Sequence, residues 1–344
     1  MGAEPDDSDS EVSGVESQFK FPVWVEVALW LWLTIGRREL ISRTGWSRTK
    51  TMKTIVMTGA SSGIGRVAAE RLLGRGHRVI GGACDSGSPE AVEVLPLDLN
   101  DLDSVRTFAM ALDIIPFDAL VLNAGLQSYN LDARTKQGFE RTFGVNHLAH
   151  YLLARLLLSR IKDGGTLVFT TSGTHDPAVK TPAPPPNHAN AEWLAYPERD
   201  PHLDRRPITA GLRAYSSSKL CNVMIARTLA THPDVSVRGL HVFAYDPGLT
   251  PGTGLAQSAP FAVRRLIWPL LPLLQPFSGG MNSLFNAGRG LADLSDGTIS
   301  SKTAIYCSLR KAKPTWPSPS TIAQDEAACA KLWQDSATMV GLPS

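Results

Sequence analysis

The sequence predicts an α/β protein with a doubly wound parallel sheet. Two observations predict it. Short apolar runs of strand length alternate with helical stretches from Lys53 onward, which is the pattern of repeated strand-helix-strand units. A glycine-rich segment, Gly59–Gly65, lies between the first apolar run and the first helical stretch, where a βαβ unit needs a tight turn.

Composition and charge exclude several classes of protein. The chain has 344 residues, of which 43% are hydrophobic and 19% charged, so wholesale disorder is excluded. A formal net charge of +2 argues against a nucleic-acid partner, because phosphate neutralisation needs a basic surplus. Cys84, Cys221, Cys307 and Cys329 form no Cys-x-x-Cys pair. We therefore expect no metal site and a reducing, cytoplasmic compartment.

Residues 1–51 form an N-terminal extension that does not fit the globular pattern. Its apolar run Phe21–Gly36 contains Glu26 and is shorter than the roughly 20 residues that span a bilayer. Its acidic residues precede the run and its basic residues follow, the reverse of a secretory signal. Two interpretations remain: an interfacial anchor in peripheral contact with a membrane, or a poorly ordered extension. We favour the second, because Met52 begins a complete strand-and-loop unit.

Each predicted strand is a short apolar run, and each predicted helix has apolar residues at helical spacing. The strands are Thr54–Thr58, Arg78–Ala83, Val92–Leu97, Ala119–Leu122, Thr166–Thr170 and Leu240–Ala244. The helices are Val67–Gly74, Asp101–Asp113, Phe139–Ile161 and Tyr215–Thr231. All of them belong to one predicted domain, residues 52–344, which ends in a helix over 322–340.

Two segments break the alternation of strands and helices. Residues 176–213 are rich in proline, so we expect an insert that crosses the surface without regular helix or central strand. Residues 250–280 hold an apolar stretch interrupted by prolines, with Arg264 and Arg265. This second segment fits either a core-packing helix pair or an apolar lid over a substrate cleft.

The glycine-rich turn predicts a dinucleotide site. Small residues let the backbone approach a pyrophosphate, whose charge the free N–H groups at the helix start stabilise. Two further segments, Asp98-Leu99 and Asn123-Ala124-Gly125, follow the third and fourth strands and so reach the same edge of the sheet. The candidate cofactor-binding residues here are Thr58, Gly59, Ser61, Ser62, Gly63, Ile64, Gly65, Asp98, Leu99, Asn123, Ala124 and Gly125.

The end of the second strand leaves the choice between NAD and NADP open. An acidic residue there would bind the ribose 2′-hydroxyl, and an arginine would favour a 2′-phosphate. The chain has Ala83 and Cys84 at these positions, followed by Asp85.

Tyr215 and Lys219 are the candidate proton-transfer pair. Their spacing places them on one face of a helix, and a nearby ammonium is expected to lower the pKa of a tyrosine from about 10 toward the working range. Ser172 follows the fifth predicted strand, where its hydroxyl could hold a substrate oxygen beside Tyr215. Asn146 is buried by pattern and could bridge a water to Lys219 in a proton relay.

Together these motifs, with Asp246-Pro247-Gly248, resemble the short-chain dehydrogenase/reductase family over residues 53 to about 310. The resemblance implies a single Rossmann-type domain that binds a nicotinamide cofactor. It implies Tyr215 as catalytic acid/base, with Lys219 holding both the ribose and the tyrosine pKa. It also implies Ser172 orienting the substrate, Asn146 in the relay, and Pro247 and Gly248 lining the nicotinamide pocket. Helices of this family often pair across a dimer interface, so a homodimer is an open expectation.

A narrower resemblance is to light-dependent protochlorophyllide reductases and their retinol-dehydrogenase-like relatives. It rests on the run Ala214–Asn222, the long gap between Ser172 and Tyr215, and the C-terminal run Lys331–Leu342. That reductase carries cysteines in the loops after the fourth and sixth strands, and this chain has none there. A dark reaction on a bulky apolar substrate is therefore the better interpretation.

The sequence thus predicts an NAD(P)-dependent oxidoreductase that transfers a hydride to or from the carbonyl or hydroxyl carbon of a lipophilic small molecule, with NADP preferred by resemblance. Two alternatives stay open. One is protochlorophyllide reduction, a C=C reduction with NADPH. The other is a dinucleotide sensor without catalysis, against which the complete set of Tyr215, Lys219, Ser172 and Asn146 argues.

Overall fold

A computed structural model describes residues 51–83, 87–253 and 281–343 of the chain. The chain divides into two units, Met1–Thr51 and Met52–Ser344, and the fold described below is that of the second. The N-terminal extension expected over residues 1–51 lies outside the described residues except for Thr51. Within the described ranges, no helix combines the length and apolar character of a membrane span.

The centre of the unit is an eight-stranded sheet with the order β3-β2-β1-β4-β5-β6-β7-β8. All neighbouring strands are parallel except β7 and β8, which are antiparallel. The strands are β1 (Thr54–Thr58), β2 (Arg78–Ala83), β3 (Glu93–Pro96), β4 (Phe117–Leu122), β5 (Ile161–Thr170), β6 (His241–Asp246), β7 (Tyr306–Arg310) and β8 (Lys313–Thr315). The predicted doubly wound parallel sheet is confirmed.

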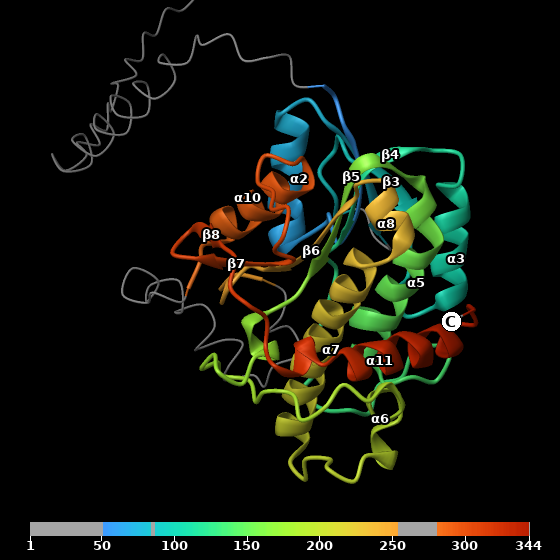
Figure 1. The fold of residues 1–344 in the computed structure, drawn as a ribbon, viewed down its shortest axis with the longest axis vertical. Helices are drawn as coiled ribbons and strands as arrows, with labels where there is room; N and C mark the ends of the chain where they lie inside the picture. Colours follow the sequence, from blue (N-terminus) through green and yellow to red (C-terminus); the bar gives the residue numbers. More distant parts are fainter. Residues whose placement is uncertain (1–50, 84–86, 254–280, 344) are drawn as a thin grey trace, which may run out of the picture. The chain divides into compact units, whose positions relative to one another are not determined.

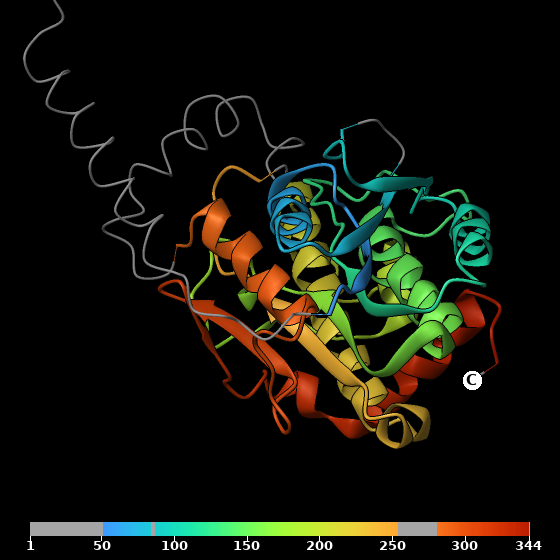
Figure 2. The ribbon, with the colours of Figure 1, turned by 90° about the horizontal axis from the view of Figure 1, so that it is seen from above.

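Helices cover both faces of the sheet, as Figures 1 and 2 show. The α-helices are α2 (Gly63–Gly74), α3 (Leu102–Ala111), α4 (Arg141–Phe143), α5 (Ala149–Leu157), α6 (Ala191–Ala195), α7 (Pro207–Ala230), α8 (Pro233–Val237), α10 (Leu284–Ser295) and α11 (Glu326–Met339). Side chains alternate along β1: Ile55 and Met57 pack in one core with α2 and α10, and Val56 packs in the other with α3, α5 and α7. Because both faces are covered, the strands read as continuous apolar runs.

The chain runs outward from β1 to β3 and then returns to β4, which lies on the other side of β1. The strand order therefore reverses between β1 and β4. In open parallel sheets this reversal leaves a crevice at the carboxyl ends of the strands, where ligands bind.

The single helix predicted over Phe139–Ile161 is wrong in its detail. The structure divides it into α4, a π-helical turn at Gly144–Leu148, α5 and a 3₁₀ turn at Leu158–Arg160. Strand β5 already begins at Ile161. Apolar spacing does not distinguish these helical forms, because they differ by one residue in their hydrogen bonding. Asn146 lies within the π-turn, and such turns are frequent at functional sites.

The expectation that residues 176–213 lack regular helix is also wrong. This insert contains α6 and a 3₁₀ turn at Pro197–Arg199, and α7 begins at Pro207, well before Tyr215. Two of its prolines stand at the first position of a helix, where a missing N–H costs nothing. The backbone N–H of Glu140 donates to the Ala195 carbonyl at 2.8 Å, so the insert packs against the domain.

Four elements had no sequence prediction: α8, α10, β7 and β8. Helix α10 packs closely on α2, since a Cβ on Gly288 would lie 2.5 Å from the Cβ of Val67. Strands β7 and β8 form a hairpin whose turn residues Lys311 and Ala312 have φ of 48° and 60°. The C-terminal α11 lies within the range 322–340 in which a helix is expected.

The ends of the expected lid, residues 250–280, lie side by side. Leu249 and Met281 form an isolated parallel bridge, and the Asn282 side chain donates to the carbonyls of Pro247 and Leu309 at 2.9 Å each. Residues 254–280 themselves lie outside the described ranges, so the lid stays a prediction.

Replacement of Gly211 tests the packing of α7. A Cβ there would lie 2.6 Å from the Ser128 carbonyl oxygen and 2.7 Å from the Asn130 nitrogen, so backbone must move. We expect Gly211→Ala to lower the free energy of unfolding by about 1–3 kcal/mol, measured by urea titration. In the control, Gly74→Ala, the new Cβ meets nothing within 4 Å, and stability should hold or rise slightly. Equal behaviour of the two variants would contradict the tight approach.

Candidate active site

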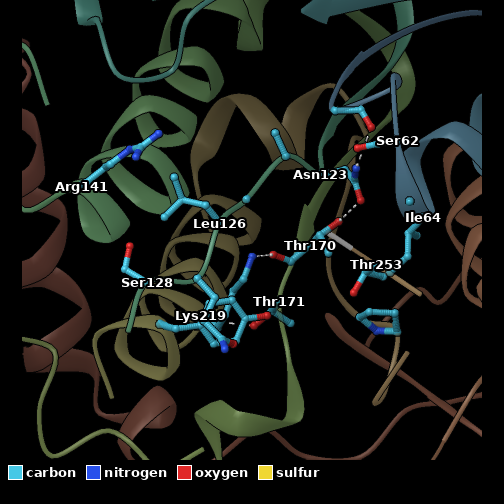
Figure 3. A pocket seen from close by; sticks show the side chains of 17 residues that line it. Ser62, Ile64, Asn123, Leu126, Ser128, Arg141, Thr170, Thr171, Lys219 and Thr253 are labelled. Carbon is cyan, nitrogen blue, oxygen red and sulfur yellow. Dashed lines mark hydrogen bonds between the residues drawn. The ribbon is translucent and has the colours of Figure 1, made fainter. Parts of the chain in front are cut away.

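A cavity of about 380 Å³ lies at the carboxyl ends of the central strands (Figure 3). Its walls come from the loops after β1, β4, β5 and β6 and from α7. Ten of the sequence-predicted site residues line it: Gly59, Ser62, Gly63, Ile64, Asn123, Ala124, Gly125, Tyr215, Lys219 and Pro247. The structure thus brings the glycine turn and the Tyr-Lys pair to one place.

The glycine turn leaves room for backbone to approach a ligand. Gly59 and Gly63 have φ of 71° and 56°, which side chains other than glycine rarely adopt. A Cβ on Gly65 would lie 2.0 Å from the Gly59 carbonyl oxygen. A glycine at position 65 therefore lets α2 start directly beneath the turn.

The start of α2 suits an anion. Ser62 precedes the helix and makes no side-chain hydrogen bond to the first turn, which contains no acidic residue. The N–H groups of that turn are thus left to a ligand, and the helix dipole favours negative charge there. A cradle of glycine backbone facing such a helix start fits the pyrophosphate of a nicotinamide dinucleotide.

Thr58 supports this cradle from behind. It is buried, and its hydroxyl accepts hydrogen bonds from the backbone N–H groups of Asn123 and Ala124, at 3.0 Å each. The Asn123 side chain donates to the Thr58 carbonyl at 3.3 Å and accepts from the Thr170 hydroxyl at 3.3 Å. These bonds join the ends of β1, β4 and β5.

Several other predicted cofactor residues, namely Ser61, Gly65, Asp98, Leu99 and Gly248, do not line the cavity. The Asp98 carboxylate accepts from the backbone and side-chain nitrogens of Asn100 at 2.8 and 2.9 Å. The N–H of Gly248 donates to Asp246 at 2.9 Å, which fixes the turn after β6. Ala83 ends β2, and Cys84 and Asp85 lie outside the described residues.

Tyr215 and Lys219 are buried together on α7, with 6% and 3% of their surfaces exposed. The Lys219 Nζ lies 5.6 Å from the centroid of the Tyr215 ring and donates to the Thr170 carbonyl at 3.1 Å. Burial lowers the pKa of Lys219 to about 8. An ammonium has three N–H donors, so within the described structure two remain for groups in the cavity.

The protein alone does not show the lowering of the Tyr215 pKa that the sequence predicts. Burial raises the pKa of the Tyr215 hydroxyl well above its ordinary value, and a hydrogen bond with the Ser172 side chain lowers it by less. Desolvation opposes the phenolate more strongly than the neighbouring groups favour it. Tyr215 is therefore protonated near neutral pH, as a proton donor must be.

Ser172 and Asn146 lie close to this pair but do not line the cavity. Ser172 follows β5, and its hydroxyl accepts from the Thr174 N–H at 3.3 Å. Asn146 is fully buried, and its side chain bonds both backbone groups of Leu126, at 2.8 and 2.9 Å. A Cβ on Gly125 would lie 3.2 Å from both Asn146 Oδ1 and Lys219 Nζ. The structure therefore brings Asn146 and Lys219 to the same side of Gly125.

Sequence reasoning missed several cavity residues: Leu126, Gln127, Ser128, Arg141, Thr170, Thr171 and Thr253. Thr171 holds α7 in place, since its hydroxyl donates to the Lys219 carbonyl at 2.7 Å. Asn222, one turn beyond Lys219, donates to the Asn146 carbonyl at 3.0 Å. Its position on the same helix face as Lys219 was the available signal, whereas the loop residues carry no pattern of their own.

A parallel sheet with a dinucleotide cradle and a buried Tyr-Lys pair defines a nicotinamide-dependent oxidoreductase. The sequence model of the family described as short chain dehydrogenase matches residues 53–181. Dehydrogenase/reductase SDR family member 13 of Bos taurus is 32% identical, over 84% of this chain and 74% of that protein. This chain belongs to the short-chain dehydrogenase/reductase family and is an NAD(P)-dependent enzyme of that family.

Two further comparisons agree with this membership. A protochlorophyllide reductase of Avena sativa is 30% identical, over 84% of this chain and 99% of that protein. The crystal structure of an uncharacterized protein from Mycobacterium Paratuberculosis matches with a TM-score of 0.59 at 27% identity, over 87% of this chain and 98% of that one. The predicted family, fold class and enzyme class are confirmed.

Lys219→Met tests the buried ammonium through stability. The pKa of Lys219 is about 8 in the folded protein and about 10.4 in an unfolded chain. Below pH 8 the folded state carries the full cost of the buried charge, and this cost disappears as pH rises through the unfolded pKa. Relative to Lys219→Met, wild type should gain roughly 3 kcal/mol between pH 8 and 10.5. A constant difference in unfolding free energy across that range would contradict the depressed pKa.

Proposed function

We propose that this chain transfers a hydride between a nicotinamide cofactor and the carbonyl or hydroxyl carbon of a lipophilic small molecule, with Tyr215 as general acid/base. The observation that carries the proposal is the position of Tyr215: buried beside Lys219 on the cavity wall, with a hydrogen bond to the Ser172 side chain. A proton donor fixed next to a serine hydroxyl suits a substrate oxygen that gains negative charge during reduction.

Each residue of the site has a distinct role in the proposed reaction. The bound cofactor supplies or accepts the hydride. Ser172 orients the substrate oxygen toward Tyr215, which donates its proton in reduction or receives one in oxidation. Lys219 holds the cofactor ribose and stabilises the phenolate that Tyr215 becomes. Asn146 holds a water that returns a proton toward Lys219.

A lipophilic substrate is supported by the apolar character of a segment of the sequence. Thr253 lines the cavity, and the apolar run Ala259–Phe277 follows it shortly in the sequence. The resemblance to retinol-dehydrogenase-like relatives points to the same class. An apolar substrate would leave its oxygen as the polar group for Ser172 and Tyr215.

We further propose NADP as the cofactor. Strand β2 ends at Ala83, which offers neither a carboxylate to a ribose 2′-hydroxyl nor a guanidinium to a 2′-phosphate. The resemblance to protochlorophyllide reductases supports the choice of NADP.

Protochlorophyllide reduction is the second candidate, favoured by the 30% identity to the Avena sativa enzyme over 99% of its length. The loops after β4 and β6 read Asn123-Ala124-Gly125 and Pro247-Gly248-Leu249, without the cysteines that the resemblance would lead us to expect. Illumination of the protein with NADPH and the pigment decides between the two. A pigment absorbance change that depends on light would support the second candidate over the first.

Tyr215→Phe tests the proton-transfer role. Loss of a general acid should lower kcat/KM by about 10²–10⁴-fold over a panel of lipophilic aldehydes, ketones and alcohols, while NADPH affinity stays within about twofold. The control is Tyr196→Phe, which removes a hydroxyl from the insert, where the ring packs on Phe139. Undiminished turnover in Tyr215→Phe would refute the assignment.

Titration of the protein with NADPH and with NADH tests the cofactor. We expect NADPH to bind at least about tenfold more tightly, equivalent to about 1.4 kcal/mol. Fluorescence of the reduced nicotinamide reports both dissociation constants. Tighter binding of NADH would overturn the choice of NADP without touching the Tyr215 assignment.

A further inference from the structure

His150 is a fully buried imidazole beside the site for which neither the family resemblance nor the proposed mechanism has a role. It lies on α5, directly after the π-turn that contains Asn146. Its Nε2 is 3.1 Å from the Thr58 hydroxyl oxygen, and its Nδ1 is 3.2 Å from the Asn146 carbonyl oxygen. The ring therefore links the end of β1 to the π-turn.

The hydrogen bonds around Thr58 determine which nitrogen of His150 carries the proton. The Thr58 hydroxyl accepts from two backbone N–H groups, those of Asn123 and Ala124. A hydroxyl has two lone pairs and one proton, so the proton of Thr58 is left to donate to Nε2. Nε2 is consequently the acceptor, and the Nδ1–H donates to the Asn146 carbonyl.

This arrangement also keeps the ring neutral. A second proton on Nε2 would face a hydroxyl whose lone pairs are both occupied. Burial and the charge of Lys219 lower the pKa of His150 to about 3. The imidazole therefore does not exchange protons in the working range of pH and acts as a fixed donor and acceptor.

We infer that His150 is a positioning residue that joins the dinucleotide cradle and Asn146 into one hydrogen-bonded unit. Through the Thr58 hydroxyl, it holds the backbone of Asn123 and Ala124, which line the cavity. Through its Nδ1–H, it shares the Asn146 carbonyl with the Asn222 amide, which donates at 3.0 Å. Two side-chain donors thus converge on that carbonyl, so the orientation of Asn146 depends on them.

An apolar side chain at position 150 would break this unit at both ends. The Thr58 hydroxyl would have to turn its proton elsewhere and give up one of the two N–H bonds that hold the loop after β4. A buried polar group left without a partner destabilises the arrangement that buries it. The loss should appear in cofactor affinity, because the loosened backbone lines the cavity.

The test compares His150→Leu with His150→Gln, whose amide supplies one acceptor and one donor. We expect His150→Leu to weaken NADPH binding by about tenfold and to lower kcat by about tenfold, and His150→Gln to stay within about threefold of wild type in both. The inference rests on the proposed cofactor site and on the proposed role of Asn146. NADPH affinity is measured without substrate, so a failed Tyr215 assignment leaves this test intact.

Tyr151→Leu is the matched control. Tyr151 is the next residue of α5, equally buried, and its hydroxyl donates to the Trp333 carbonyl of α11 at 3.2 Å, away from the cavity. Its loss should lower the Tm as His150→Leu does while leaving the NADPH dissociation constant unchanged. If His150→Leu loses stability but keeps cofactor affinity and kcat, His150 is only a core residue and the inference is overturned.

Thr58→Val decides the matter if His150→Leu does not fold. It removes the hydroxyl while keeping the side-chain volume, so NADPH affinity should fall by about tenfold. Thr58→Ser, which keeps the hydroxyl, should recover most of the NADPH affinity that Thr58→Val loses. Unchanged NADPH affinity in Thr58→Val would refute the linkage between the ring and the cradle.

Discussion

The burial of the Lys219 ammonium constrains the rest of the site. A cation removed from water costs several kcal/mol unless it is bonded, and here the Thr170 carbonyl at the end of β5 accepts from it. The neighbouring Thr171 hydroxyl holds the Lys219 carbonyl from the same strand end. These two bonds fix α7 against the carboxyl end of β5. They therefore also fix the position of Tyr215 on α7 and the part of the cavity wall that α7 forms.

A second buried charge, the carboxylate of Asp246, is bonded more completely than the Lys219 ammonium. Asp246, at the end of β6, accepts from the hydroxyls of Tyr306 and Ser308 and from the Gly248 N–H, and it pairs with Arg310 at 3.2 Å. Its oxygens are fully engaged, so it stabilises the junction of β6 and β7. Lys219, by contrast, keeps donors directed to the cavity. The difference in hydrogen bonding separates a charge that is satisfied within the fold from one that retains donors for a ligand.

The sheet and most of the cavity wall could be predicted from the sequence, because both depend on local patterns of residues. Apolar runs identify strands covered on both faces, and a glycine turn between strand and helix identifies the dinucleotide edge. The sequence did not predict the π-turn at Asn146, because α-, π- and 3₁₀-helical turns have similar apolar spacing. The helices of the insert were not predicted because proline usually ends a helix, although Pro197 and Pro207 each stand at the first position of one. The pKa of Tyr215 depends on its burial, which the spacing between Tyr215 and Lys219 in the sequence does not reveal.

The two edges of the sheet share one property. Strand β3 ends at Pro96, and β8 is the short run Lys313-Pro314-Thr315. A proline has no N–H to offer a further strand, and a lysine resists apolar contact. Neither edge is therefore a good template for another copy of the chain to add a strand. An apolar sheet with such edges is thus protected against edge-to-edge aggregation.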